Sequence, residues 1–260
     1  MNINSTIKGF LFDLDGVFCI ENQVLPGAIE TLDYLNLKKV PYRFLTNTTT
    51  KSRVSLFEKL INLGLPVKLN YIISASYAGV LKLKALGSPT CQLILQENSK
   101  EDYVDFKIDD DNPEYIVVGD LDQDWNFEII NDIFNKILNG SKMLALHKGK
   151  YFKTSLGMQI DSGAFIKGIE YASSTESLVI GKPEKDFFNM AVKDIAIQKE
   201  NLAMIGDDIT NDIYGAQKSG IKSILVKTGK YRQDLIEKSN IKPDLIINSI
   251  DEIIQLPIEK

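Results

Sequence analysis

The sequence predicts an α/β protein built on a doubly wound parallel sheet of Rossmann-like appearance. Short apolar runs alternate along the chain with longer segments that carry an apolar face at helical spacing, and this alternation is typical of a parallel sheet covered by helices. Several apolar runs end directly in Asp, Asn or Thr, and ligands bind at the carboxyl edge of such sheets. The apolar fraction of 44% and the charged fraction of 25% are those of a globular protein.

The first third of the chain shows the alternation most clearly. It is organised around residues 7–19, where a short apolar run predicts a buried strand that stops at Asp13. Asp15 and Gly16 follow at once, and glycine lets the chain turn sharply there. Further strands are predicted at 41–45 and 71–73, and helices at 28–39, 52–63 and 76–86.

The middle of the chain also alternates, but less regularly. We expect strands at 92–96, 115–118 and 143–146, a hairpin over 150–160, and helices at 126–138 and 164–173. The acidic run 109–113 predicts a solvated loop, with cation binding as the less favoured alternative.

From residue 179 onward the regular pattern returns. Helices are predicted at 184–195, 209–218 and 251–256, and strands at 202–205, 223–226 and 245–247. No low-complexity linker separates two domains, so we expect any second domain to be an insertion that leaves and re-enters the first.

Composition excludes several classes of function. The net charge of −5 provides no basic field, so we expect neither a nucleic acid nor a membrane as partner. No apolar run approaches the ~20 residues of a membrane span, and the first ten residues lack the layout of a signal peptide. The two cysteines lie far apart in the sequence, stand at no metal-ligand spacing and do not indicate a disulfide framework. This usage suits the reducing cytosol, so a cytoplasmic protein is expected. With His147 as the single histidine, acid–base chemistry falls to carboxylates and lysines.

Four polar clusters follow short apolar runs or precede helices, and we expect them to converge on one edge of the sheet. The clusters are Asp13/Asp15, Thr46/Asn47, Lys182 and Asp207/Asp208/Asp212. Carboxylates bind a hard cation such as Mg²⁺, a lysine offers a point charge to phosphate, and small polar groups bind further phosphate oxygens. Together these residue types are suited to Mg²⁺-assisted phosphoryl transfer.

In this order and spacing the clusters resemble the motifs of the haloacid dehalogenase (HAD) superfamily. D-x-D-G-V stands at 13–17, a Thr-Asn pair at 46–47, G-K-P at 181–183 and G-D-x-x-x-x-D at 206–212. The resemblance covers nearly the whole chain and is most specific in the C-terminal half. It implies a HAD-like core and Mg²⁺-dependent hydrolysis of a small phosphorylated metabolite, a phosphoamide or pyrophosphate through an aspartyl-phosphate.

The resemblance also implies the roles of the first motif. Asp13 would be the nucleophile that becomes phosphorylated, and Asp15 would be the general acid and base. Both would hold Mg²⁺, Asp15 through its backbone carbonyl. Family members that dehalogenate or pump lack an acid at the position of Asp15, so its presence favours a phosphatase or a phosphomutase.

The other motifs would hold the metal and the phosphoryl group. Asp207 would be the third protein ligand of the metal, and Asp208 and Asp212 would support the metal indirectly. Thr46 and the Asn47 amide would bind the transferring phosphoryl group, and Lys182 would balance its charge.

The stretch between the second and third motifs resembles the α/β cap of the type IIA branch. We therefore expect a catalytic core at residues 1–75 and 181–260 and an inserted cap at 76–180. Caps of this type dimerise in relatives, which makes a homodimer an expectation here. Residues 91–112 resemble the branch least, and we expect them to influence the choice of substrate.

Some alternatives stay open at this point. A phosphomutase would use the same chemistry, and a phospho-accepting module or inactive scaffold would use none of it. NAD binding is disfavoured because no G-x-G-x-x-G follows the first strand. His147, Lys148 and Lys150 either contact a phosphorylated leaving group or form a solvent-facing basic hairpin, and the second is expected. Cys19 is expected to be a packed, inert thiol.

Overall fold

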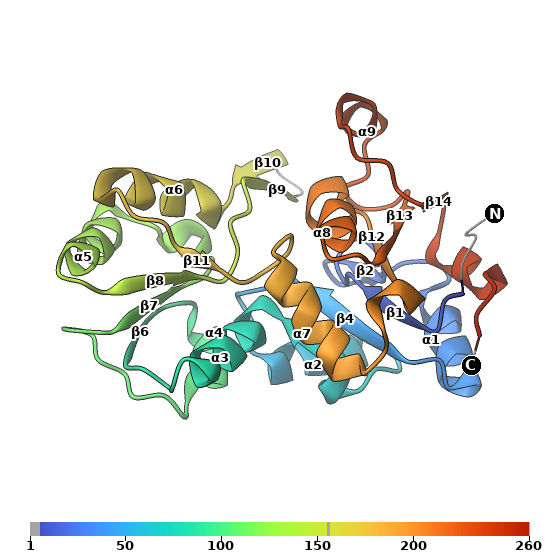
Figure 1. Ribbon diagram of the computed structural model, residues 1–260, viewed down its shortest axis with the longest axis horizontal. Coiled ribbons are helices and arrows are strands. Elements are labelled where there is room, and N and C mark those ends of the chain that lie inside the picture. The colour runs from blue at the N-terminus through green and yellow to red at the C-terminus, as the bar shows by residue number, and fades with distance from the viewer. Residues whose placement is uncertain (1–5, 155–156, 260) are drawn as a thin grey trace. The chain divides into compact units, whose positions relative to one another are not determined.

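A computed structural model describes residues 6–154 and 157–259 of the chain, and it divides into two compact units (Figure 1). The first unit holds the described residues up to Thr46, then Leu56–Ile73 and the chain from Lys182 onward; the second holds Asn47–Ser55 and Ser74–Gly181. Residues 47–55, expected in the core, group with the second unit because the Ser52 amide donates to Asn98 Oδ1 (3.0 Å) and the Arg53 amide to Asp102 Oδ1 (3.0 Å). None of the described helices combines the length and the apolar character needed to span a membrane.

The first unit is built on a six-stranded sheet in the order β14-β13-β12-β1-β4-β5. Its strands are β1 (Gly9–Phe12), β4 (Tyr42–Thr46), β5 (Ile72–Ser74), β12 (Leu202–Gly206), β13 (Lys222–Val226) and β14 (Leu245–Ile247). β1 pairs in parallel with both β4 and β12. From β1 the chain proceeds outward through β4 and β5, and from β12 it proceeds outward on the other side. The strand order therefore reverses between β1 and β12, and the carboxyl edge at such a reversal is where open α/β sheets bind ligands.

Helices cover both faces of this sheet. On one face lie α1 (Ala28–Lys38), α2 (Arg53–Asn62) and η6 (Ile250–Gln255), which share a hydrophobic core with the strands. On the other face α7 (Lys185–Ile195), η5 (Ile209–Tyr214) and α8 (Gly215–Lys218) pack against one another and against β4, β12 and β13. Shorter elements are the β2–β3 hairpin (Cys19–Ile20, Gln23–Val24), η1 (Leu69–Tyr71), η4 (Lys199–Asn201) and α9 (Gln233–Lys238).

The second unit has its own parallel sheet in the order β11-β8-β7-β6. The strands are β6 (Cys91–Ile94), β7 (Tyr115–Val118), β8 (Lys142–Ala145) and β11 (Leu178–Val179). α5 (Phe127–Leu138) and α6 (Ser162–Ser173) pack together over β7 and β8 and bury a core that includes Ile116 and Ile166. The remaining elements are α3 (Ala75–Ala85), α4 (Glu97–Lys100), η2 (Glu101–Tyr103), η3 (Asp122–Asp124) and the hairpin β9–β10 (Tyr151–Thr154, Gly157–Ile160).

The predicted fold class is confirmed, and the differences concern local geometry. The helix predicted at 209–218 is a wide helical turn, η5, followed by the short α8. The helix predicted at 251–256 is the 3₁₀ segment η6. The two-residue strands β2, β3 and β11 were not predicted because they are too short to show a period. The acidic run 109–113 is a loop, in which Asp109 Oδ1 accepts hydrogen bonds from the Asp111 and Asn112 amides.

Candidate active site

Asp13 stands directly after β1, at the edge where the strand order reverses. Its amide donates to the Ile205 carbonyl (2.9 Å), which joins the ends of β1 and β12. The side chain is 13% exposed, and its Oδ1 accepts a hydrogen bond from the Leu14 amide (2.8 Å). Asp13 is therefore accessible to a small molecule while its backbone is held by the sheet.

The turn after Asp13 is held by its own apolar residues. Leu14 and Phe18 are buried, and the Phe18 ring packs on Phe12 with a centroid distance of 5.1 Å. Asp15, between them in the sequence, keeps part of its surface exposed, although many protein atoms surround its carboxyl group. That burial of the carboxyl group and the nearby Asp13 carboxylate raise the pKa of Asp15 above its ordinary value. A raised pKa suits a carboxyl group that must donate a proton.

Lys182 bridges two of the predicted aspartates. Its Nζ lies 2.8 Å from Asp13 Oδ1 and 2.7 Å from Asp212 Oδ1. Lys182 and Asp212 are both buried, with 3% and 0% of their surfaces exposed. Although burial opposes it, the two carboxylates raise the pKa of Lys182, so the ammonium form is kept. This buried cation has the position needed to balance negative charge beside Asp13.

Asp212 reaches Lys182 because the end of β12 leaves room for it. A Cβ on Gly206 would lie 2.2 Å from Asp212 Oδ2, so only glycine permits this packing. Asp212 Oδ2 also accepts a hydrogen bond from the Asp208 amide (3.1 Å). Both oxygens of Asp212 are thus engaged by the protein.

Asp207 is buried and its two carboxylate oxygens have different surroundings. Oδ2 accepts a hydrogen bond from the Lys230 amide (2.6 Å). Oδ1 is buried and accepts no hydrogen bond from any residue that the structure describes. Burial, reinforced by Asp13 and opposed by Lys230, raises the pKa of Asp207 to about 7. A buried carboxylate oxygen without a donor is unusual, because burying such an atom costs free energy unless a partner compensates it.

These aspartates fit a divalent cation. Carboxylate oxygens of Asp13, Asp207 and Asp212 lie within 4.8 Å of one another. Since Lys182 and the Asp208 amide already engage Asp212, the available oxygens are those of Asp13 and Asp207, and Asp212 acts on the site indirectly. All-oxygen donors of this kind match Mg²⁺, whose positive charge would also oppose the burial and the repulsion by Asp13 that raise the pKa of Asp207.

Asp208 has a local structural role. It is the N-cap of η5: its Oδ1 accepts hydrogen bonds from the Thr210 and Asn211 amides (both 2.9 Å), and its Oδ2 lies 3.6 Å from Lys230 Nζ. Its predicted support of a metal stays a prediction.

The second predicted motif is divided between the two units. Thr46, the last residue of β4, is buried in the first unit. The parallel register pairs Phe12 with Phe44, so Asp13 and Thr46 both lie just beyond that pair on neighbouring strands. Asn47 groups with the second unit, where its Oδ1 would lie 2.7 Å from a Cβ on Gly181.

Residues 224–231 are part of the family resemblance, but the sequence analysis assigned no role to the loop that follows β13. The amide of Lys230 in this loop binds Asp207, and the Thr228 hydroxyl donates to the Gly16 carbonyl. The available signal was the position of a Gly-containing polar run directly after a predicted strand, at the same edge as the four motifs.

The expectation of a solvent-facing basic hairpin is wrong for His147, which is buried, whereas Lys148 is partly exposed and Lys150 is exposed. Contacts within the second unit hold His147 and Lys148. His147 Nδ1 accepts a hydrogen bond from the Gly149 amide (3.1 Å), so in the neutral ring Nε2 carries the proton, and Ser162 Oγ lies 3.3 Å from it. That tautomer cannot take a proton from Ser162. Lys148 Nζ lies 2.7 Å from the buried Glu170 carboxylate, which engages its charge.

Cys19 belongs to the hydrophobic core, and burial and the neighbouring Asp15 raise the pKa of its thiol to about 11. Such a thiol is inert at neutral pH.

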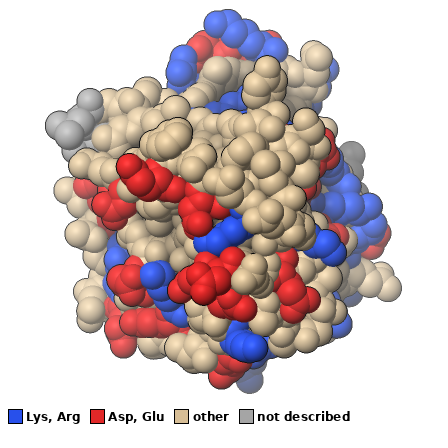
Figure 2. Space-filling model, turned by 90° about the vertical axis from the view of Figure 1, so that its left-hand side faces the viewer, with Lys and Arg blue, Asp and Glu red and all other residues tan. Residues whose placement is uncertain are grey.

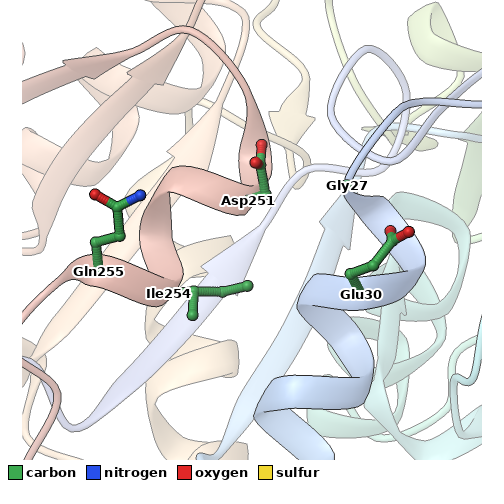
Figure 3. A pocket seen from close by; sticks show the side chains of 5 residues that line it. All are labelled: Gly27, Glu30, Asp251, Ile254 and Gln255. Carbon is green, nitrogen blue, oxygen red and sulfur yellow. The ribbon is translucent and has the colours of Figure 1, made fainter.

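A separate hollow lies between the start of α1 and η6 (Figure 3). It is lined by Gly27, Glu30, Asp251, Ile254 and Gln255. None of the motif residues lines it, and its two charged residues are acidic, so it is unsuited to a phosphate group.

Figure 2 shows acidic groups with a few basic ones between them over the front of this face, and further basic groups toward its top and right-hand edge. No continuous basic surface is visible on that face, in keeping with the net charge of −5.

The chain is similar in sequence to two family models and to known proteins over nearly its whole length. A family model described as haloacid dehalogenase-like hydrolase matches residues 10–108, and one described as HAD-hydrolase-like matches residues 179–253. Haloacid dehalogenase-like hydrolase domain-containing protein 2 of Bos taurus is 34% identical over 259 residues, which cover 98% of this chain and 99% of that protein. Phospholysine phosphohistidine inorganic pyrophosphate phosphatase of Homo sapiens is 28% identical over 259 residues, covering 97% and 95% of the two chains.

A solved structure gives the same result for the fold. The crystal structure of 4-nitrophenylphosphatase from Thermotoga maritima superposes with a TM-score of 0.90 at 26% identity, covering 96% of this chain and 97% of that one. The two family matches together contain every residue of the four motifs.

Proposed function

This chain belongs to the haloacid dehalogenase-like hydrolases, as its motifs predicted, and is an enzyme of their phosphatase type; from this premise we propose that it is a Mg²⁺-dependent phosphatase acting through a phosphorylated Asp13. The proposed substrate is a small phosphorylated metabolite, a phosphoamide or pyrophosphate. The observation that carries the proposal is the Lys182 bridge between Asp13 and Asp212, next to Asp207 Oδ1, which accepts no hydrogen bond from the described part of the chain.

In the first half-reaction Asp13 attacks phosphorus. Two donors, Lys182 Nζ and the Leu14 amide, engage Oδ1, so we assign the attack to Oδ2. The bond between Asp13 and phosphorus forms while the bond from phosphorus to the leaving group breaks, and Asp15 donates the proton that the leaving group needs. The raised pKa of Asp15 supports this assignment.

In the second half-reaction Asp15 takes a proton from water, which attacks phosphorus. The bond between phosphorus and Asp13 breaks, and inorganic phosphate leaves with the nucleophile restored. Lys182 balances charge on the transferring group throughout, because its buried ammonium has no solvent to screen it.

Mg²⁺ would be held by Asp13, Asp207 and the Asp15 carbonyl, and when bound it supplies positive charge to the phosphoryl oxygens. Asp208 and Asp212 would support it indirectly, Asp212 by fixing Lys182. Thr46 and the Asn47 amide would bind the remaining phosphoryl oxygens.

The second unit is proposed as the cap domain of such an enzyme, and the first unit as its catalytic core. We retain the expectations of a cytoplasmic protein and of a homodimer, and light scattering of the purified chain measures the oligomeric state. Neither nucleic acid nor membrane is proposed as a partner.

The decisive variant is Asp13→Asn, assayed with p-nitrophenyl phosphate with and without Mg²⁺. We expect turnover to fall by at least about 1,000-fold, because asparagine cannot form the phosphoenzyme. Asp33→Asn, an exposed position on α1, is the matched control and should retain activity within about twofold. Full Mg²⁺-dependent turnover by Asp13→Asn would show that the nucleophile is elsewhere.

A substrate panel then defines the class of substrate. It compares imidodiphosphate, pyrophosphate, phosphoglycolate, pyridoxal phosphate and nucleoside monophosphates by release of inorganic phosphate. Transfer to a second hydroxyl without phosphate release would identify a phosphomutase instead.

A further inference from the structure

The loop Thr228–Lys230 follows β13 and has no role in the reaction steps above. It makes contacts with two other segments of the candidate site. The Lys230 amide donates to Asp207 Oδ2 (2.6 Å), and the Thr228 hydroxyl donates to the Gly16 carbonyl. Gly16 lies in the turn after β1, and Asp207 follows β12, so the loop joins the ends of the two strands at which the sheet order reverses.

Two glycines enclose the carboxylate of Asp207. A Cβ on Gly16 or on Gly229 would lie 1.9 Å from Asp207 Oδ2. A Cβ on Gly229 would also lie 2.6 Å from the Cα of Gly16. Both glycines have positive φ, +84° and +51°. The carboxylate therefore lies between two backbone segments that approach more closely than any side chain would allow.

This enclosure makes the two oxygens of Asp207 unequal. Oδ2 is held by a backbone amide, whereas Oδ1 is buried and, among the described residues, has no hydrogen-bond donor. With Oδ2 bound by an amide and enclosed by two glycines, the carboxylate is oriented to present Oδ1 to a cation. The side chain of Lys230 does not make this contact: it is 48% exposed, and its Nζ lies 3.6 Å from Asp208.

We infer that Thr228–Lys230 is a positioning loop that orients Asp207 so that Oδ1 faces the cation site, and that it holds the Asp15-bearing turn against the same carboxylate through Gly16. The inference rests on the proposed function, because it assumes that Asp207 and Asp13 hold a divalent cation. If the inference is right, changes in the loop weaken cation binding even in variants that remain folded.

The first test is Gly229→Ala compared with Gly64→Ala. Both replace a glycine of positive φ in the first unit, but a Cβ on Gly64 meets its nearest atom only at 4.0 Å. Mn²⁺ binding to the full chain is titrated by the EPR signal of the free ion. Gly229→Ala should bind Mn²⁺ at least about tenfold more weakly than wild type, the usual size of an effect on groups that orient a metal ligand. Gly64→Ala should stay within about twofold.

The second test covers the case in which Gly229→Ala does not fold. Thr228→Val removes the donor to Gly16 at nearly constant shape, and Thr228→Ser keeps the donor. Mn²⁺ affinity should fall about three- to tenfold in the valine variant and recover to within about twofold in the serine variant. The Mg²⁺ concentration that gives half-maximal hydrolysis of p-nitrophenyl phosphate should rise by the same factor in the valine variant, while turnover at saturating Mg²⁺ largely recovers.

The outcomes separate the two proposals. A folded Gly229→Ala with the Mn²⁺ affinity of Gly64→Ala overturns the inference, and so does Thr228→Val with the affinity of wild type. If wild-type protein neither binds Mn²⁺ nor shows Mg²⁺-dependent turnover, the proposed function itself fails.

Discussion

Replacing Lys182 by methionine is the most informative perturbation of this site. The change keeps an unbranched side chain of similar length and removes the only described cation that lies between Asp13 and Asp212. Both Lys182 and Asp212 are buried, so water cannot take over the lost interaction. The variant therefore leaves two carboxylates facing each other across an apolar side chain.

The distances give the magnitude. At 2.8 Å and 2.7 Å, each attraction of Lys182 amounts to about 6 kcal/mol at an effective dielectric constant of about 20. The cost of burying the ammonium and the repulsion between the carboxylates offset most of this sum. Breaking a buried ion pair by removing one partner costs about 3–5 kcal/mol, and we expect a loss of that size in the free energy of unfolding at pH 7.5.

The loss depends on pH in a definite direction. Burial and Asp13 raise the pKa of Asp212, and Lys182 opposes this increase. Without Lys182 the pKa rises further, so protonation removes the unpaired charge as the pH falls. A group with a raised pKa in the folded state stabilises the protein at low pH and loses that contribution as the pH rises. The deficit of the variant should therefore be smaller at pH 5.5 than at pH 7.5.

Urea unfolding followed by far-UV circular dichroism measures this effect. Tryptophan fluorescence is less suitable, because Trp125, the single tryptophan, lies in the second unit and Lys182 lies in the first. Lys185→Met, at an exposed position on α7, is the control and should change stability by less than about 0.5 kcal/mol. Adding Asp212→Asn to Lys182→Met should restore at least about 1 kcal/mol, because it removes the orphaned charge.

Hydrolysis of p-nitrophenyl phosphate by the Lys182→Met variant should fall by at least about 100-fold, which is typical of losing a preorganised charge at the reacting group. Wild-type stability at pH 7.5, or a deficit that grows on acidification, would refute the assignment of Lys182 as the buried bridge.

Three further outcomes are expected. Burial and Asp13 raise the pKa of Asp207 to about 7, so without a divalent cation the free energy of unfolding should fall as the pH rises from about 4 to about 7. In urea titrations, 10 mM Mg²⁺ should remove most of this pH dependence. An equal pH dependence with and without Mg²⁺ would contradict the proposed metal site. Burial opposes ionisation of Glu170, but hydrogen bonds from Lys148 and neighbouring donors lower its pKa to about 2; Glu170→Gln should therefore cost about 1–2 kcal/mol at pH 7, with the difference fading as the pH falls toward about 2, whereas a pH-independent difference would argue against the ion pair. Burial raises the pKa values of Cys19 and Cys91 to about 11, so 5,5′-dithiobis(2-nitrobenzoic acid) should react with neither thiol at pH 8 until urea unfolds the chain; rapid reaction of the native protein would show that a thiol is accessible.

Much of the fold could be predicted because its signals are local. The strand at 115–118 was predicted with its observed bounds, since a buried apolar run between turn residues has one ready interpretation. Predicted helices such as 184–195 differ by one residue at the start, where Glu184 is the N-cap. The helix predicted at 209–218 was inaccurate in its geometry, since residues 209–214 form the wide turn η5 and only the short α8 follows.

In the candidate site, too, local patterns predicted some features and others depend on packing. Asp13, Lys182 and Asp207 could be selected as candidates because polar residues after parallel strands meet at one edge. The motif G-D-x-x-x-x-D includes Asp212 and leaves Asp208 at a variable position, but both were expected to support the metal in the same indirect way. Packing distinguishes them: Asp208 caps η5 with local amides, whereas Asp212 enters the space left by Gly206 and binds Lys182.

By itself, the sequence determined the fold class, the family and the residues available for phosphoryl transfer, because strand periodicity and motif order are properties of neighbouring positions. Only the tertiary structure decided which oxygen of Asp207 is held by the Lys230 amide, that Lys182 bridges two aspartates, and that Thr228–Lys230 contacts Gly16 and Asp207. These features depend on distances between segments that are remote in the chain. Such distances follow from how side chains fill the space between elements, and a linear pattern does not contain that information.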